Sequence, residues 1–262
     1  MTLLAVDNIA IQFGGVKAVD DLSFAVEKGQ IFSIIGPNGA GKTTLFNMIS
    51  GIYRPSRGRV TLEGTDVTGL PPHLLARRGL SRTFQNLQIF YRMTALENVM
   101  VGCHLQERRS VLAHLLALPS VKRQNAESRD RAHALLTRVG LSADAEKDAG
   151  NLSYGALKRL EIARALASDP KLLLLDEPAA GCNHVETEEI DALIQTIAQD
   201  GVTVALVEHD MKLVMKISHR ILVLDYGRKL AEGSAQEVRQ NPDVIRAYLG
   251  SQASVGAAHA GT

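Results

Sequence analysis

The sequence is poor in cysteine and aromatic residues, contains no tryptophan and carries almost no net charge. Its two cysteines, Cys103 and Cys182, exclude a disulfide framework and a CxxC metal or redox motif, and such a composition is typical of a reducing compartment. The 29 Lys and Arg nearly balance the 28 Asp and Glu, which argues against a dedicated nucleic-acid-binding protein. A ligand or partner must therefore be recognised at a local site.

Long hydrophobic runs are missing as well. The longest candidate, Val111–Leu118, falls far short of the roughly 18 residues needed to cross a bilayer, and His114 interrupts it. The first positive charge is Lys17, so the beginning of the sequence does not predict a secretory signal. With 262 residues, 45% of them hydrophobic, the chain can form one large or two small folded domains.

Apolar runs rich in β-forming residues alternate with helical patterns. The continuous runs are Ile31–Ile35, Leu172–Leu175, Val202–Val207 and Ile221–Leu224. Such runs predict parallel strands buried on both faces. Shorter alternating patterns between residues 10 and 35 and at Val60–Glu63 predict an antiparallel edge layer. The sequence therefore predicts an α/β fold with a mixed or parallel sheet.

Strand patterns disappear from about Asn86 to Ala167, where Ala126–Val139 has helical spacing. We expect a helical subdomain over 86–167, inserted into an α/β core formed by 1–85 and 168–250. Residues 251–262 are small and polar without periodicity, and we expect them to form a disordered tail.

A phosphate-binding loop follows the first apolar run, at residues 36–44 (GPNGAGKTT). Gly36, Gly41, Lys42 and Thr43 match the GxxxxGK[ST] pattern, and the helical run Leu45–Ile49 supplies the helix that the motif requires. The expected nucleotide-binding residues are Gly36, Pro37, Asn38, Gly39, Ala40, Gly41, Lys42, Thr43 and Thr44. A glycine-rich turn without a ligand is the alternative, and the strand–loop–helix context argues against it.

The chemistry of this motif assigns separate roles to its residues. Glycines bring backbone N–H groups close to phosphate oxygens, and the helix N-terminus adds positive charge. Lys42 would contact the β- and γ-phosphates, and the Thr43 hydroxyl would bind Mg²⁺.

Two carboxylates end the apolar run KLLLLDE at residues 171–177. A buried strand delivers its last residues to the carboxyl edge of a sheet, where ligands bind in open α/β folds. Asp176 would organise Mg²⁺ and Glu177 would polarise the attacking water. Taken alone, such a residue is more often a loop or helix-cap residue, and His209 after the run 202–207 is more often structural.

The stretch LSYGA at residues 152–156 leads into a helical pattern. Its serine, Ser153, lies 23 residues before Asp176 (176 − 153 = 23). Here the sequence resembles the ATP-binding subunits of ABC transporters, and the resemblance extends over residues 3–250. The elements that carry it are, in order, Phe13, the phosphate loop, Gln85, LSYGA, the strand ending in Glu177, a D-loop at Ala180–Asn183, and His209.

This resemblance implies ATP and Mg²⁺ as cofactors and a second ATPase subunit as partner. Ser153 and Gly155 would contact, in trans, the γ-phosphate of ATP held by that partner. Gln85 would sense Mg²⁺ and the water, and His209 would contact the γ-phosphate; with Glu177 and Lys42 they form the implied catalytic set.

The resemblance further implies that Phe13 stacks on the adenine; from the residues alone, a core position in the first strand is an equal alternative. Ala156 stands where the signature glutamine is usual, and Cys182 departs from the usual D-loop.

One subfamily is suggested by the stretches Arg82–Gln85, Pro178–Gly181, Glu208–Met215 and Asn241–Gly250. They are similar to the ATPases of branched-chain amino-acid importers. This implies a bacterial importer with a related second ATPase, or a homodimer in isolation. Two permeases and, indirectly, a periplasmic binding protein would complete it. The chain would lie peripherally on the cytoplasmic side of the inner membrane and bind no nucleic acid.

Other systems share much of this pattern. Urea or amide importers and lipopolysaccharide-export ATPases are alternatives of the same class. A non-transport ABC ATPase acting on nucleic acid or ribosomes is an alternative of another class, but such proteins usually carry tandem cassettes. The amphipathic segment 107–123 would either lie against membrane subunits or lipid headgroups, or pack on its own subdomain.

Overall fold

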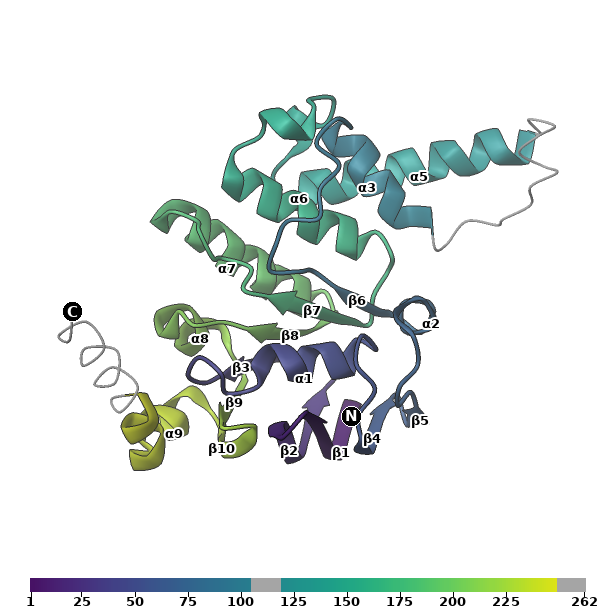
Figure 1. The fold of residues 1–262 in the computed structure, drawn as a ribbon. Helices are drawn as coiled ribbons and strands as arrows, with labels where there is room; N and C mark the ends of the chain where they lie inside the picture. The colour runs from purple at the N-terminus through teal and green to yellow at the C-terminus, as the bar shows by residue number, and fades with distance from the viewer. Residues whose placement is uncertain (105–118, 249–262) are drawn as a thin grey trace.

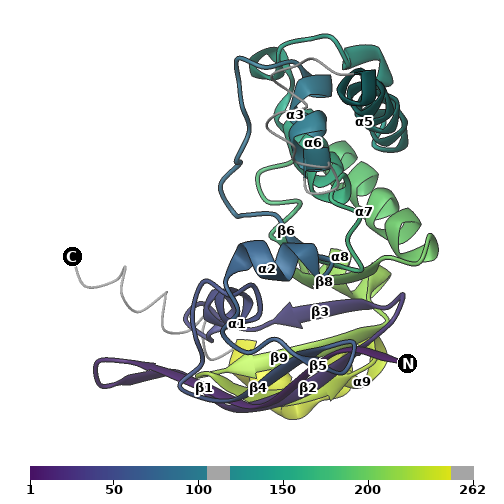
Figure 2. The same cartoon turned by 90° about the vertical axis from the view of Figure 1, so that its right-hand side faces the viewer.

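The computed structural model describes residues 1–104 and 119–248. The predicted tail at 251–262 and most of the amphipathic segment 107–123 therefore lie outside the described residues. Two sheets form the lower part of the molecule, and a group of helices forms the upper part (Figure 1). The turned view shows the four-stranded sheet and helices α3, α5 and α6 at opposite ends (Figure 2).

A six-stranded sheet in the order β10-β9-β3-β8-β7-β6 forms the centre. Its strands are β3 (Ile31–Ile35), β6 (Leu80–Arg82), β7 (Leu172–Asp176), β8 (Thr203–Val207), β9 (Arg220–Asp225) and β10 (Arg228–Gly233). All neighbours pair in parallel except β9 and β10. Every residue of β3, β7 and β8 is buried, as expected for strands covered on both faces.

The second sheet has four antiparallel strands in the order β2-β1-β4-β5. They are β1 (Thr2–Phe13), β2 (Val16–Glu27), β4 (Arg57–Leu62) and β5 (Thr65–Asp66). Helix α1 (Lys42–Ile49) lies between the two sheets, and its Leu45 and Phe46 are fully buried in the core they share with Phe32 (Figure 1). The predicted antiparallel layer is thus present and begins earlier in the chain than expected.

Helices cover the other face of the six-stranded sheet. The remaining helices are α2 (Pro72–Arg77), α3 (Ala95–Cys103), α5 (Pro119–Arg138), α6 (Tyr154–Leu166), α7 (His184–Gln199), α8 (Met211–Ile217) and α9 (Ala235–Gln240), with short 3-10 turns at Ser142–Asp144 and Ala149–Asn151. One apolar core joins α3, α5, α6 and α7 to β7 and β8.

Local sequence signals define several helix starts. Thr94 and Glu97 form a reciprocal capping box at α3, and Asn183 and Glu186 form one at α7. Ser153 caps α6 by accepting a hydrogen bond from the Ala156 backbone.

The α/β fold class with an antiparallel layer and helices between β6 and β7 is confirmed. The boundaries of the helical subdomain at 86 and 167 stay a prediction. Within residues 1–104 and 119–248, no helix is both long enough and apolar enough to cross a bilayer.

A buried ion pair ties the edge strand β6 to its neighbour. The Arg82 guanidinium lies 2.8 Å from the Asp176 carboxylate, and both side chains are 5% exposed. Arg82 also donates to Asn47 Oδ1 and Ser50 Oγ, each at 2.7 Å, at the end of α1. One side chain therefore joins β6, β7 and α1.

Replacing Arg82 with Met should lower the free energy of unfolding by about 3–5 kcal/mol, because Asp176 would keep a buried charge without a partner. Urea titration followed by circular dichroism measures the change. Arg78→Met, which removes the same charge from an exposed position, should stay within about 0.5 kcal/mol of the wild type. Equal effects of the two substitutions would contradict the assigned role of the pair.

Candidate functional site

The phosphate loop runs from the end of β3 to the start of α1 in a backbone conformation that needs glycine. Gly36 has φ 155° and Gly41 has φ 96°. A Cβ on Gly36 would lie 2.2 Å from the Leu224 carbonyl oxygen, and one on Gly41 would lie 2.5 Å from the Ala18 carbonyl oxygen. No side chain fits at either position, so the pattern of glycines has a steric cause.

Helix α1 begins at Lys42 directly after Gly41, which has no side chain to cap the first backbone N–H groups. These donors and the positive end of the helix dipole are suited to an anion. The Lys42 ammonium donates to the carbonyl oxygens of Gly36 at 2.7 Å and Pro37 at 3.0 Å. Burial lowers the pKa of Lys42, against the opposing charges of Glu177 and Asp176.

A cavity of about 440 Å³ opens in front of this loop. Its lining residues are Val16, Lys17, Ala18, Asn38, Gly39, Ala40, Gly41, Lys42, Thr43, Thr44, Gln85, Glu177 and Tyr226. The structure therefore brings most of the predicted phosphate loop, including Lys42, together with Gln85 and Glu177, so that three of the four predicted catalytic residues line one cavity. The sequence motifs gave no reason to select Lys17 or the exposed Tyr226.

Glu177 lies at the carboxyl end of β7 with φ 50°, a conformation that is uncommon for a residue with a side chain. Its N–H donates to the Val207 carbonyl of β8 at 2.9 Å, which holds this turn. Gln85 Nε2 donates to Glu177 Oε2 at 3.1 Å, and His209 Nδ1 lies 3.9 Å from Glu177 Oε1. Two of the four predicted catalytic side chains, Gln85 and His209, thus converge on the carboxylate of a third, Glu177.

Asp176 is differently placed. Its side chain is buried against Arg82, and it does not line the cavity beside Glu177. No group of three or more His, Cys, Asp or Glu side chains suited to a metal occurs within the described part of the chain. Mg²⁺ in nucleotide sites uses one or two protein oxygens together with phosphate oxygens and water. The Thr43 hydroxyl and the Gln85 amide oxygen, whose residues line the cavity, fit that chemistry, whereas the predicted ligand Asp176 is paired with Arg82 in this structure.

The remaining predicted residues lie apart from the cavity lining. Phe13, at the end of β1, is 46% exposed and meets Tyr53 edge to face with 5.2 Å between ring centroids, so the alternative of a core position is wrong. Ser153 and Gly155, at the start of α6, contact Glu186 on α7 instead of the phosphate loop. Within this one chain, the signature does not reach the loop's cavity.

Two buried charges near the site were not identified from the sequence. Lys158 of α6, 2% exposed, donates to the Glu177 carbonyl oxygen at 3.3 Å. Glu208, 1% exposed, accepts from the backbone N–H groups of Ala179 and His209, and burial raises its pKa. The position of Glu208 between an apolar run and His209 was the available signal.

Comparisons with known proteins agree with this arrangement. The family model described as ABC transporter matches residues 19–180, and the model described as branched-chain amino acid ATP-binding cassette transporter matches residues 228–254. Two relatives are high-affinity branched-chain amino acid transport ATP-binding proteins, LivG of Salmonella typhimurium and BraF of Pseudomonas aeruginosa. They are 48% and 47% identical, each covering 95% of this chain and 98% of its own length.

Solved structures show the same fold. A nucleotide-free ATP-binding cassette from an ABC transporter has a TM-score of 0.83 at 34% identity and covers 95% of this chain and 99% of its own. A dimeric cassette in a post-hydrolysis state with ADP and phosphate has a TM-score of 0.74 at 26% identity, covering 89% of this chain and 99% of its own.

Family model, relatives and fold all indicate an ATP-binding cassette. The chain is an ATP-binding and ATP-hydrolysing subunit of the ABC transporter family, in the group whose C-terminal region is that of branched-chain amino acid cassettes.

Proposed function

We propose that the chain binds Mg²⁺–ATP in the cavity before the phosphate loop and hydrolyses it to power the import of branched-chain amino acids. The observation that carries the hydrolytic part is the convergence of Gln85 and His209 on Glu177, beside the donors of the phosphate loop. Backbone N–H groups and Lys42 bind the phosphates, and Phe13, exposed at the end of β1, stacks on the adenine.

Glu177 serves as the general base in this proposal. Its carboxylate holds the attacking water and accepts its proton, while Gln85 and His209 orient the water and the γ-phosphate. Bound Mg²⁺ would neutralise charge on the β- and γ-phosphates, with Thr43, Gln85 and Asp176 holding or orienting it. Lys42, which donates to Gly36 and Pro37, exchanges these carbonyl oxygens for phosphate oxygens.

A second ATPase subunit completes the site. Ser153 and the Gly155 N–H lie at the N-terminus of α6, which favours an anion, but they do not line the cavity of their own chain. Pairing with the phosphate loop of another subunit lets these donors reach a γ-phosphate in trans. A related ATPase as partner gives a heterodimer, and a second copy of the chain gives a homodimer.

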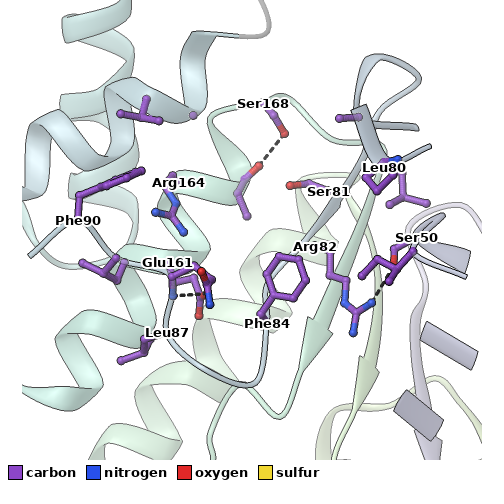
Figure 3. A pocket seen from close by; sticks show the side chains of 18 residues that line it. Ser50, Leu80, Ser81, Arg82, Phe84, Leu87, Phe90, Glu161, Arg164 and Ser168 are labelled. Atoms are coloured by element: carbon purple, nitrogen blue, oxygen red, sulfur yellow. Dashed lines mark hydrogen bonds between the residues drawn. The ribbon is translucent and has the colours of Figure 1, made fainter. Parts of the chain in front are cut away.

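A groove of about 570 Å³ between the core and the upper helices is suited to a permease segment. Leu80 and Phe84 line its core side, and Arg164 lines its helical side (Figure 3). Val101 of α3 also lines the groove. Phe84 is 40% and Phe90 49% exposed. Arg164 lies over the Phe90 ring, 5.6 Å from its centroid.

An occupant of this groove would act directly on the catalytic centre. Gln85 follows Phe84 in the chain and donates to Glu177, so a shift of the loop moves a catalytic contact. We infer that one of the two permease subunits docks here, that the other docks on the second ATPase subunit, and that a periplasmic binding protein delivers the solute. The chain then lies peripherally on the cytoplasmic side of the inner membrane and acts on no nucleic acid.

The proposal of branched-chain amino acids as solute rests on similarity. The C-terminal region 228–254 matches the family model described for branched-chain amino acid cassettes, and relatives at 47–48% identity carry that name. We also propose that the chain consists of a core of 1–85 and 168–250 and a helical subdomain of 86–167. The subdomain moves as a unit relative to the core and is connected to it at β6 and β7.

Glu177→Gln should leave ATP binding intact and slow hydrolysis by roughly 10²- to 10⁴-fold, because the amide cannot accept the proton of the water. The steady-state ATPase rate of the assembled transporter measures this. A near-wild-type rate would refute the general-base assignment.

Lys42→Ala should abolish detectable ATP binding, since it removes the half-buried ammonium that is proposed to contact the phosphates. Calorimetric titration is the suitable measurement, because the chain contains no tryptophan for fluorescence. Lys28→Ala, at an exposed lysine paired with Glu63, is the control and should bind normally. Equal binding by both variants would argue against the phosphate site.

Phe90→Glu should reduce co-purification with the permeases at least tenfold, since a charge in the apolar groove costs about 1.4 kcal/mol or more. ATP binding by the isolated variant should be unchanged. Ile245→Glu, an exposed apolar position outside the groove, is the matched control. Unchanged recovery of permeases with the Phe90 variant would contradict docking in this groove.

A further inference from the structure

Glu186 accepts hydrogen bonds from the same donor groups that, in the proposed function, bind a phosphate. Its Oε1 accepts hydrogen bonds from the Gly155 backbone N–H at 3.1 Å and from the Ser153 hydroxyl at 3.4 Å. These are the two groups of the signature that would contact the γ-phosphate of the partner's ATP. A carboxylate of the same chain already sits at the anion-binding N-terminus of α6.

The contact is close and is held from the D-loop. A Cβ on Gly155 would lie 2.5 Å from Glu186 Cδ, so the carboxyl group lies directly against the glycine backbone. The second oxygen, Oε2, accepts from the Asn183 N–H at 3.1 Å, and Asn183 Oδ1 accepts from the Glu186 N–H at 3.0 Å. The carboxylate thus bridges the signature helix and the end of the D-loop.

The carboxylate and a γ-phosphate compete for this place. Both are negatively charged, and both would accept from the single N–H of Gly155, so their simultaneous presence adds repulsion and leaves one acceptor unpaired. When subunits are apart, Glu186 keeps the two donors hydrogen-bonded; when they close on ATP, it has to leave Gly155. Its bond to Asn183 can persist, which links the exchange to the D-loop.

We propose that Glu186 is a positioning residue of the trans phosphate site: a resident anion that holds Ser153 and Gly155 and is displaced by the γ-phosphate as the two ATPase subunits close. This inference rests on the proposed function. According to this proposal, the γ-phosphate replaces the Glu186 carboxylate at Ser153 and Gly155 when the subunits close. The carboxylate opposes closure, and the triphosphate favours it.

A capping role alone is the competing explanation, because Glu186 is also the third residue of α7 in a capping box. Glutamine also serves in such a box, so Glu186→Gln keeps the cap through its amide oxygen and removes both the charge and the second acceptor oxygen, the one that faces Gly155. Glu186→Ala removes the cap as well. Glu188→Gln removes one charge from an exposed position on the same helix, where Glu188 lies 3.9 Å from His184, and is the matched control.

The test measures hydrolysis against ATP concentration in the assembled transporter, together with calorimetric ATP binding and the unfolding midpoint of the isolated chain. Glu186→Gln should lower the half-saturating ATP concentration roughly three- to tenfold, as expected for removing one partly screened like charge. The ATP affinity and unfolding midpoint of its isolated chain should match the wild type. Glu186→Ala should lower the unfolding midpoint, and Glu188→Gln should change nothing.

An unchanged or raised half-saturating concentration for Glu186→Gln, with normal ATP binding by the isolated chain, would overturn the Glu186 proposal and leave the proposed function standing. An equal decrease in Glu188→Gln would overturn it too, because the effect would then be a general one of charge. Absence of ATP binding by the wild-type chain would instead refute the proposed function and this inference with it.

Discussion

The backbone contacts of the phosphate loop constrain everything around it. Gly36 lies against the Leu224 carbonyl at the end of β9, and Gly41 lies against the Ala18 carbonyl of β2. Each contact leaves no space for a Cβ, so the loop is held between the parallel sheet and the antiparallel layer. These contacts hold the start of α1 at the cavity that the loop lines.

Buried charged side chains near the phosphate loop are paired, and these pairs also hold neighbouring segments in place. Arg82 neutralises Asp176, and the same guanidinium reaches the C-terminal end of α1. Glu208 is buried but accepts two backbone N–H groups, so it holds the turn after Glu177 next to the backbone of His209. The carboxylate of Glu177, the proposed general base, therefore stands beside buried charges that are paired with one another or with backbone N–H groups.

The predictability of these features from sequence depends on how local their causes are. Strands β3, β7 and β8 were predictable because both faces are buried and the residues are continuously apolar. The phosphate loop was predictable because its conformation demands glycine at fixed spacing.

Contacts between segments far apart in the sequence leave no comparable local pattern of residue types. Arg82 and Asp176 are separated by 94 positions and Gly155 and Glu186 by 31, and nothing in either residue's neighbours identifies its partner. The exposure of Phe13 also depends on where β1 ends relative to the layer below it, which alternation of residue types does not specify. Sequence reasoning thus selected residues that the structure brings together around one cavity, and it missed the interactions that position them.

One helix connects the three parts of the proposed machine. At its start α6 presents Gly155 to Glu186, in its middle Lys158 donates to the carbonyl oxygen of Glu177, and toward its end Arg164 lines the groove below Phe90. Its residues are largely buried in the core that joins it to α7 and β7, so it moves as a rigid element. A displacement imposed at the groove must therefore appear at both the signature and Glu177. Such coupling requires no chain of small adjustments, because a single buried helix already touches all three sites.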